Sequence, residues 1–157
     1  MSSQKSAICN LKSKIVVGLV GGIGSGKSSV AAAFAERGAR VVSGDRAGHE
    51  ALRQQEIRQR VVERFGPGVL DAAIMIEAGW NRICDKLIFV DAPRPLRLRR
   101  LAAQRGWSAK EVETREAAQM PVDEKAKRAD HVIDNSGSPE HVAAQLDDLM
   151  RQWTSKQ

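Results

Sequence analysis

A glycine-rich loop near the start of the chain constrains the fold more than any other feature of the sequence. Residues 21–28 read GGIGSGKS, which satisfies the spacing G-x-x-x-x-G-K-[ST] at every fixed position. The loop follows a short apolar run, KIVVGLV, and precedes a helix-forming run, SSVAAAFAERG. Strand, phosphate-binding loop and helix in this order are typical of an α/β protein with a buried parallel sheet, so we expect that architecture and a bound nucleotide.

Each residue type in this loop has a chemical role. Glycines let successive backbone N–H groups turn towards phosphate oxygens, and the following helix presents its N-terminus to the anion. Lys27 supplies a mobile positive charge to the β- and γ-phosphates, and the Ser28 hydroxyl can bind Mg²⁺. The loop residues predicted to bind the nucleotide are Gly22, Ile23, Gly24, Ser25, Gly26, Lys27, Ser28 and Ser29.

The rest of the chain alternates between strand-like and helix-like runs. The predicted strands are 14–20, 39–45, a strand within 69–79 that ends near Glu77, 86–91 and 129–135. The predicted helices are 28–38, 49–66, 96–106, 108–120 and 138–153. This alternation predicts a parallel sheet of about five strands with helices on both faces.

Acidic residues fall at three of the predicted strand ends. Asp45, Glu77 and Asp91 each lie at or just past the end of a strand. Because ligands of such sheets bind at the carboxyl ends of the strands, we expect these carboxylates to converge on one rim. A capping box, Ser108 with Glu111, is predicted to begin the helix 108–120.

Composition narrows the classes of partner. The formal net charge is +6, which suits a nucleic acid, an anionic membrane or a phosphorylated small molecule. Aromatic residues make up only 4%, which argues against an RNA-binding surface of stacked rings. The basic residues concentrate in one segment, where they indicate either a solvated helix face or a phosphate-neutralising surface. That segment contains Arg94, Arg97, Arg99, Arg100 and Arg105.

Cellular context follows from a few simple features. Cys9 and Cys84 are not spaced as a metal-binding pair, so we expect free thiols in a reducing cytoplasm. No apolar run approaches the length of a membrane span, and residues 1–13 lack an apolar signal core. We interpret residues 1–13 as a disordered lead-in and residues 14–157 as a single domain.

Longer stretches of the chain resemble the dephospho-CoA kinase family. The stretches run from Val17 to Leu52, from Ile74 to Leu101 and from Arg105 to Ser138. The shared motifs are the GGIGSGKS loop, an aspartate that ends the second strand, an arginine-to-glutamine element, a following lysine, and an ending of the form AD-x-V-I-D-N-x-G. In this chain the motif residues after the loop are Asp45, Arg115 to Gln119, Lys125, and Ala129 to Gly137.

The resemblance implies a fold, a reaction and a set of roles. The fold is a three-layer, nucleoside-kinase-like P-loop NTPase with a helical lid at about residues 94–128. The reaction is transfer of the γ-phosphate of ATP, with Mg²⁺, to the ribose 3′-hydroxyl of dephospho-CoA. Asp45 orients or deprotonates that hydroxyl, and Asn135 lies near the adenine. Arg100, Arg105 and Arg115 are the lid candidates for the transferring phosphate, with Arg115 assigned to catalysis together with Lys27 and Asp45, and Arg105 assigned to ATP binding.

The chain departs from the family on the acceptor side. Ser43 stands where the family usually has aspartate, and several dozen residues are missing between Phe65 and the strand before Glu77. The missing part includes a His-Pro dipeptide and helps to hold the CoA moiety in the family. None of the histidines of this chain, His49, His131 and His141, precedes a proline.

Two further functions therefore stay open. One is an ATP-binding protein that has lost turnover, and the other is a kinase for a different small hydroxyl metabolite, such as a sugar or shikimate. We expect a small-molecule substrate and neither nucleic acid nor a membrane as partner. The sequence gives no indication of the oligomeric state.

Overall fold

A five-stranded parallel sheet forms the centre of the computed structural model, which describes residues 15–44 and 68–155. Its strands are β1 (Val16–Gly21), β2 (Arg40–Ser43), β3 (Gly68–Asp71), β4 (Lys86–Asp91) and β5 (His131–Asp134). Their order across the sheet is β2-β3-β1-β4-β5, which confirms the predicted parallel architecture. Later strands flank β1 on both sides, so the loop after β1 lies where ligands of such sheets bind.

Helices connect and cover these strands. They are α1 (Lys27–Glu36), the 3₁₀ helix η2 (Trp80–Ile83), α3 (Arg94–Arg105), α4 (Ala109–Ala117), α5 (Val122–Lys127) and α6 (Pro139–Ser155). The capping box of Ser108 and Glu111 at the start of α4 is confirmed. The sequence did not predict α5 as a separate helix, although Pro121 directly before it signals a new helix start because its ring fixes φ.

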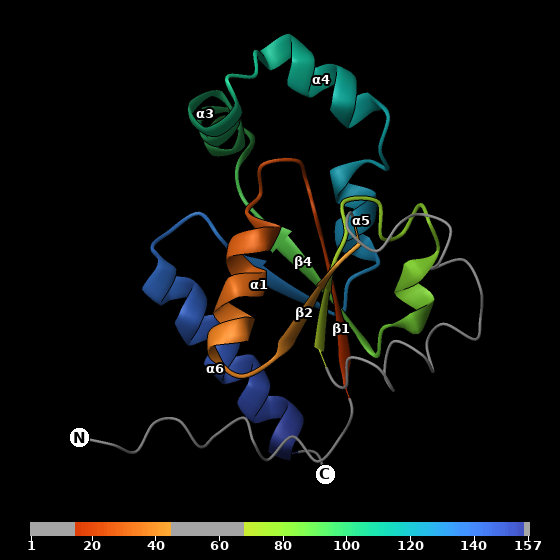
Figure 1. The fold of residues 1–157 in the computed structure, drawn as a ribbon, viewed down its shortest axis with the longest axis vertical. Coiled ribbons are helices and arrows are strands. Elements are labelled where there is room, and N and C mark those ends of the chain that lie inside the picture. Colours follow the sequence, from red (N-terminus) through yellow and green to blue (C-terminus); the bar gives the residue numbers. More distant parts are fainter. Residues whose placement is uncertain (1–14, 45–67, 156–157) are drawn as a thin grey trace.

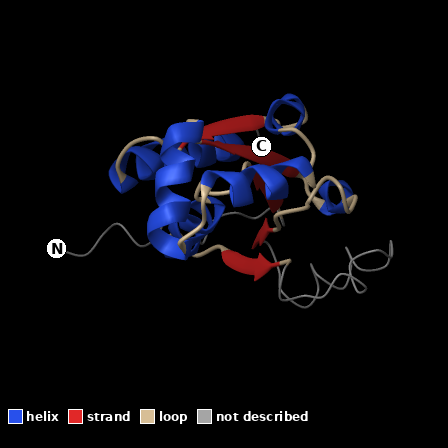
Figure 2. Cartoon of the chain, turned by 90° about the horizontal axis from the view of Figure 1, so that it is seen from above, coloured by secondary structure: helices blue, strands red, loops and turns tan. Residues whose placement is uncertain are grey.

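Different helices cover the two faces of the sheet, as Figure 1 and Figure 2 show. Side chains alternate along β1, so that Val17 and Leu19 face one layer and Val20 faces the other. One face packs against α1 and α6 through Val30, Phe34, Val142, Leu146 and Leu149. The opposite face packs against the segment after β3 and α5 through Met75, Ile76, Trp80, Val122 and Ala126.

The third strand is shorter than the sequence predicted. It ends at Asp71 and not near Glu77, because the chain leaves the sheet there and turns back on itself. Within this turn the N–H of Ala78 donates to Ile74, and the N–H of Trp80 donates to Met75. Met75 is fully buried in the turn, so its apolar character reflects burial beneath the sheet rather than an extended conformation. Glu77 is consequently not a strand-end carboxylate.

Several predictions concern residues outside the described ranges. They are the helix 49–66, the lead-in 1–13 and the position of Asp45. Within residues 15–44 and 68–155, no helix is both long and apolar enough to cross a membrane.

Candidate nucleotide-binding site

The phosphate loop connects β1 to α1 through backbone conformations that favour glycine. Gly24 and Gly26 have φ values of 76° and 88°, in the left-handed region that side chains other than glycine rarely adopt. Gly26 is the N-cap of α1, and no side chain caps this helix start within the described residues. The first turn of α1 also contains no acidic residue. The positive end of the helix dipole is therefore not compensated by a side chain of this helix start and favours an anion at the loop.

Asn135, directly after β5, and Arg100 of α3 hold the loop through their side chains. The Asn135 amide Nδ2 donates a 2.7 Å hydrogen bond to the carbonyl of Ser25, and Asn135 is only 7% exposed. Arg100 donates to the carbonyl of Ser25 at 3.4 Å and to that of Asn135 at 2.8 Å. Arg100, one of the lid candidates, is thus bound to backbone carbonyls and helps to hold the loop in place.

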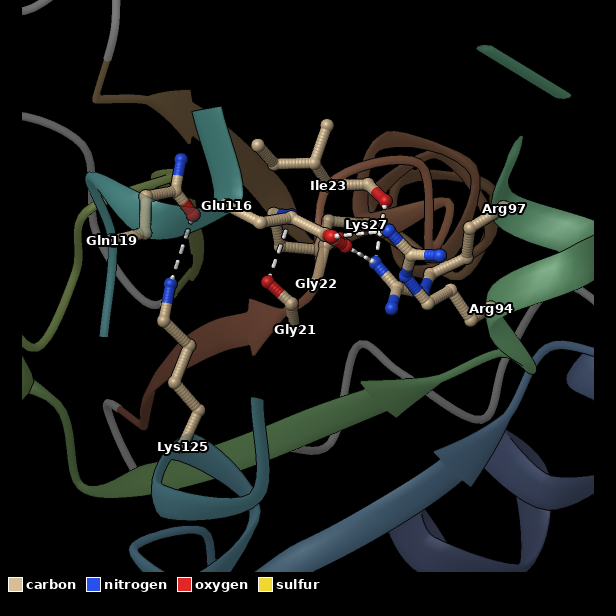
Figure 3. A network of polar contacts seen from close by, with 9 residues as sticks. All are labelled: Gly21, Gly22, Ile23, Lys27, Arg94, Arg97, Glu116, Gln119 and Lys125. Carbon is tan, nitrogen blue, oxygen red and sulfur yellow. Dashed lines mark hydrogen bonds and ion pairs between the residues drawn. The ribbon is translucent and has the colours of Figure 1, made fainter. Parts of the chain in front are cut away.

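Lys27 lies inside the loop that it follows. Its Nζ is 3.4 Å from the carbonyl oxygens of both Gly21 and Gly22 (Figure 3). These two distances are long for hydrogen bonds, so both contacts are weak. The ammonium group therefore already lies within the loop, where phosphate oxygens would be bound.

Ser28 and Asp71 bring the loop and the sheet together. The Ser28 hydroxyl donates a 3.0 Å hydrogen bond to Asp71 Oδ2 at the carboxyl end of β3. Sequence reasoning missed Asp71 because it extended the strand to Glu77. The signal that could have found it is an aspartate directly after the apolar residues Val69 and Leu70. A hydroxyl and a carboxylate side by side are the oxygen donors with which P-loop proteins hold Mg²⁺.

These groups open into a cavity of about 830 Å³. Above the loop, α3 and α4 form an arch (Figure 1), and three of their arginines, Arg100, Arg105 and Arg115, line the cavity. The guanidinium groups of Arg105 and Arg115 lie 4.9 Å and 4.1 Å from the centroid of the Trp107 ring. Arg115 is exposed on α4 and lines the cavity, so its guanidinium can contact an anion bound there.

Most of the predicted site residues meet in this cavity. Nine of them line it, namely Ile23, Gly24, Gly26, Lys27, Ser28, Ser29, Arg105, Arg115 and Asn135. Gly22 faces Arg97 on the other side of the loop, and Ser25 is buried beneath it. Asp91 ends β4 as predicted. Asp45 lies outside the described residues, although Gly44 directly before it binds β3 through the Asp71 carbonyl at 2.8 Å.

Lys125, part of the family-like motif, anchors the far end of the arch. Its fully buried Nζ is 3.0 Å from Glu77, 3.1 Å from Gln119 Oε1 and 3.2 Å from the carbonyl of Ala73. Glu77 also accepts a 2.8 Å hydrogen bond from the N–H of Met120. Partial burial opposes ionisation of Glu77, but backbone N–H groups and Lys125 outweigh it and hold the pKa of this carboxyl below its ordinary value. This network ties the turn after β3 to α5.

Comparison with known families supports the kinase interpretation. A family model described as dephospho-CoA kinase matches residues 15–73 and 69–141. The dephospho-CoA kinase of Bacillus licheniformis is 32% identical over 196 aligned residues, which cover 90% of this chain and 98% of that protein. The dephospho-CoA kinase of Aquifex aeolicus is 31% identical, with 88% and 97% covered. Since the chain itself has only 157 residues, the 196-residue alignment must open gaps in it, which agrees with the missing acceptor segment.

Solved structures share the fold of this chain. A Thermus thermophilus protein, TT1252, superposes with a TM-score of 0.71 and 28% identity, covering 90% of this chain and 98% of that one. Shikimate kinase from Acinetobacter baumannii gives a TM-score of 0.65 at 14% identity, covering 94% and 97%. That second likeness concerns the three-layer P-loop kinase fold alone. Because the family model and close relatives span most of its length, the chain belongs to the dephospho-CoA kinase family.

Proposed function

We propose that this chain transfers the γ-phosphate of ATP to the ribose 3′-hydroxyl of dephospho-CoA. The observation that carries the proposal is the convergence of the phosphate loop, Lys27 and the Ser28–Asp71 pair on one cavity. Membership of the dephospho-CoA kinase family gives the reaction and the acceptor.

Described residues account for the proposed contacts with the ATP phosphates. The N–H groups of the loop and of the first turn of α1 bind the β- and γ-phosphates of ATP. Lys27 Nζ exchanges its two 3.4 Å carbonyl contacts for phosphate oxygens and neutralises charge as the phosphoryl group moves. Asn135 and Arg100 hold the carbonyl of Ser25 and so keep this part of the loop in place.

The oxygen pair of Ser28 and Asp71 fits Mg²⁺. The hydroxyl and the carboxylate are 3.0 Å apart, face the cavity and belong to the hard oxygen donors that Mg²⁺ prefers. Ser28 and Asp71 would hold the ion, which would offset the negative charge of the transferring phosphate.

The acceptor hydroxyl needs a group that receives its proton. We assign this role to Asp45. The preceding residue, Gly44, lies just past the end of β2, and β3 separates β2 from β1. Proton transfer from the 3′-hydroxyl to the Asp45 carboxylate accompanies attack of the oxygen on the γ-phosphorus, and ADP leaves. Arg115 of α4 stabilises the transferring group, and Arg105 of α3 binds the ATP phosphates.

One observation keeps a second function in view. The alignment with the Bacillus licheniformis relative contains gaps in this chain, which is shorter than its relatives by several dozen residues. A different small hydroxyl acceptor is the alternative that fits a shortened acceptor side. ADP release with dephospho-CoA, compared with a panel of sugars and shikimate and with an ATP-binding titration, separates the two functions from binding without turnover.

A further inference from the structure

We propose that Glu116 is a positioning residue, which connects α4 to the phosphate loop through Arg97 and thereby fixes Arg115 over the transferring phosphate. The inference deepens the proposed function, because it rests on Arg115 acting on that phosphate. The connection itself is a geometric feature of the structure and can be tested separately.

One carboxylate joins the two helices of the arch. Glu116 Oε1 is 2.6 Å from Arg97 Nη1, and Glu116 Oε2 is 3.3 Å from Arg94 Nη2 (Figure 3). Both arginines belong to α3, whereas Glu116 lies near the end of α4. The charge-assisted contact to Arg97 is short enough to be among the strong hydrogen bonds of a protein.

Arg97 continues the connection into the phosphate loop. The same Nη1 donates a 3.0 Å hydrogen bond to the carbonyl of Ile23. The guanidinium also lies directly against Gly22, where a Cβ would approach Nη1 to 2.6 Å and Cζ to 2.9 Å. A displacement of Glu116 therefore acts on the loop through a single guanidinium group, and a displacement of the loop acts on α4 in the same way.

Burial makes this ion pair matter more than one on the surface. The Arg97 side chain is 7% exposed and that of Glu116 is 21% exposed. The Arg97 Nε has no hydrogen-bond partner among the described residues. Loss of the Glu116 charge would leave a buried guanidinium with the Ile23 carbonyl as its remaining acceptor in the described contacts, which is costly in a region of low polarity.

The phosphate loop and the end of α4 are not closely packed against each other around this ion pair. A cavity of about 270 Å³, lined by Gly22, Arg97, Glu116 and Gln119 among others, lies between the loop and the end of α4. Polar contacts therefore span the gap between α4 and the loop. Consecutive residues of an α-helix project about 100° apart, so one helix can present Glu116 to α3 and Arg115 to the nucleotide cavity.

The kinetic test is a double-mutant cycle of Glu116→Gln and Arg115→Ala. Glu116→Gln keeps the shape but removes the charge, and we expect kcat to fall by about tenfold while the KM for ATP changes by less than about twofold. In the Arg115→Ala background the same substitution should have no further effect on kcat, because Glu116 acts through Arg115. Equal losses in both backgrounds would overturn the proposal. Glu113→Gln, on the exposed side of the same helix, is the matched control and should leave kcat unchanged.

Hydrogen exchange on the full chain tests the connection without any turnover. Amides of residues 112–117 should exchange about tenfold faster in Glu116→Gln than in the wild type, and Glu113→Gln should match the wild type. Unchanged exchange in Glu116→Gln would overturn the connection. Absence of ADP release from the wild type with dephospho-CoA would instead overturn the proposed function, and the exchange result would still decide whether Glu116 fixes α4.

Discussion

The hydroxyl of Ser28 donates a 3.0 Å hydrogen bond to Asp71, which joins the first turn of α1 to the end of β3. The two residues are 43 positions apart, yet β1 and β3 are neighbouring strands in parallel register. The sheet itself therefore sets the distance between the loop hydroxyl and the carboxylate. The pairing of β1 with β3 would therefore assemble the proposed Mg²⁺ site.

Substitution of Asp71 by asparagine should remove the carboxylate but leave its shape. We expect turnover to fall by about a hundredfold, because the proposed Mg²⁺ site would lose its carboxylate. Calorimetric titration should show that Mg²⁺ no longer strengthens ATP binding. Asp123→Asn, an exposed aspartate on α5, is the control, and an unchanged Mg²⁺ effect in Asp71→Asn would contradict the assignment.

Substitution of Lys27 by alanine should leave the loop folded and nearly abolish catalysis. The two 3.4 Å carbonyl contacts of Lys27 are weak, so their loss should lower the melting temperature only slightly. The missing positive charge should lower kcat by about a hundredfold or more. Steady-state kinetics and thermal melting check both parts, with the exposed Lys110→Ala as control. Activity within a few-fold of the wild type would argue against Lys27 as a phosphate ligand.

Substitution of Asn135 by alanine should loosen the loop from behind. The carbonyl of Ser25 would lose its 2.7 Å amide donor and keep only the longer 3.4 Å contact with Arg100. We expect about tenfold weaker ATP binding and a loss of about 1 kcal/mol in the free energy of unfolding. Calorimetry and chemical denaturation measure these quantities. If ATP binding were weakened with no loss of stability, direct contact with the adenine would explain Asn135 better.

The sequence predicted the parts of the site that depend on local backbone conformation, and missed those that depend on tertiary packing. The loop could be read directly, because its glycines and Lys27 act through local backbone geometry. Asp71 could not, because an apolar run such as VLDAAIMI is compatible with a longer strand, and only the packing of Met75 beneath the sheet ends it. The supporting role of Arg100 also depends on tertiary contacts with Ser25 and Asn135 that spacing does not encode.

The Glu77–Lys125 pair should make stability depend on acidity. The folded state lowers the pKa of Glu77 below its ordinary value of 4.5, so the unfolded chain takes up a proton first as the pH falls. The stabilising contribution of Glu77 is therefore complete above about pH 4.5 and declines as the pH drops through the folded pKa. Denaturation at pH 7 and at lower pH should show a smaller acid-induced loss in Glu77→Gln than in the wild type. Equal losses would mean that the pair does not contribute.

The central claim is tested most directly by measuring ADP release from ATP and Mg²⁺ in the presence of dephospho-CoA, with the product identified by mass. The proposed function predicts saturable ADP release, coenzyme A as the product, and near-complete loss of activity in Asp45→Asn. ATP binding without any conversion of dephospho-CoA, or comparable turnover with the Asp45→Asn variant, would contradict it.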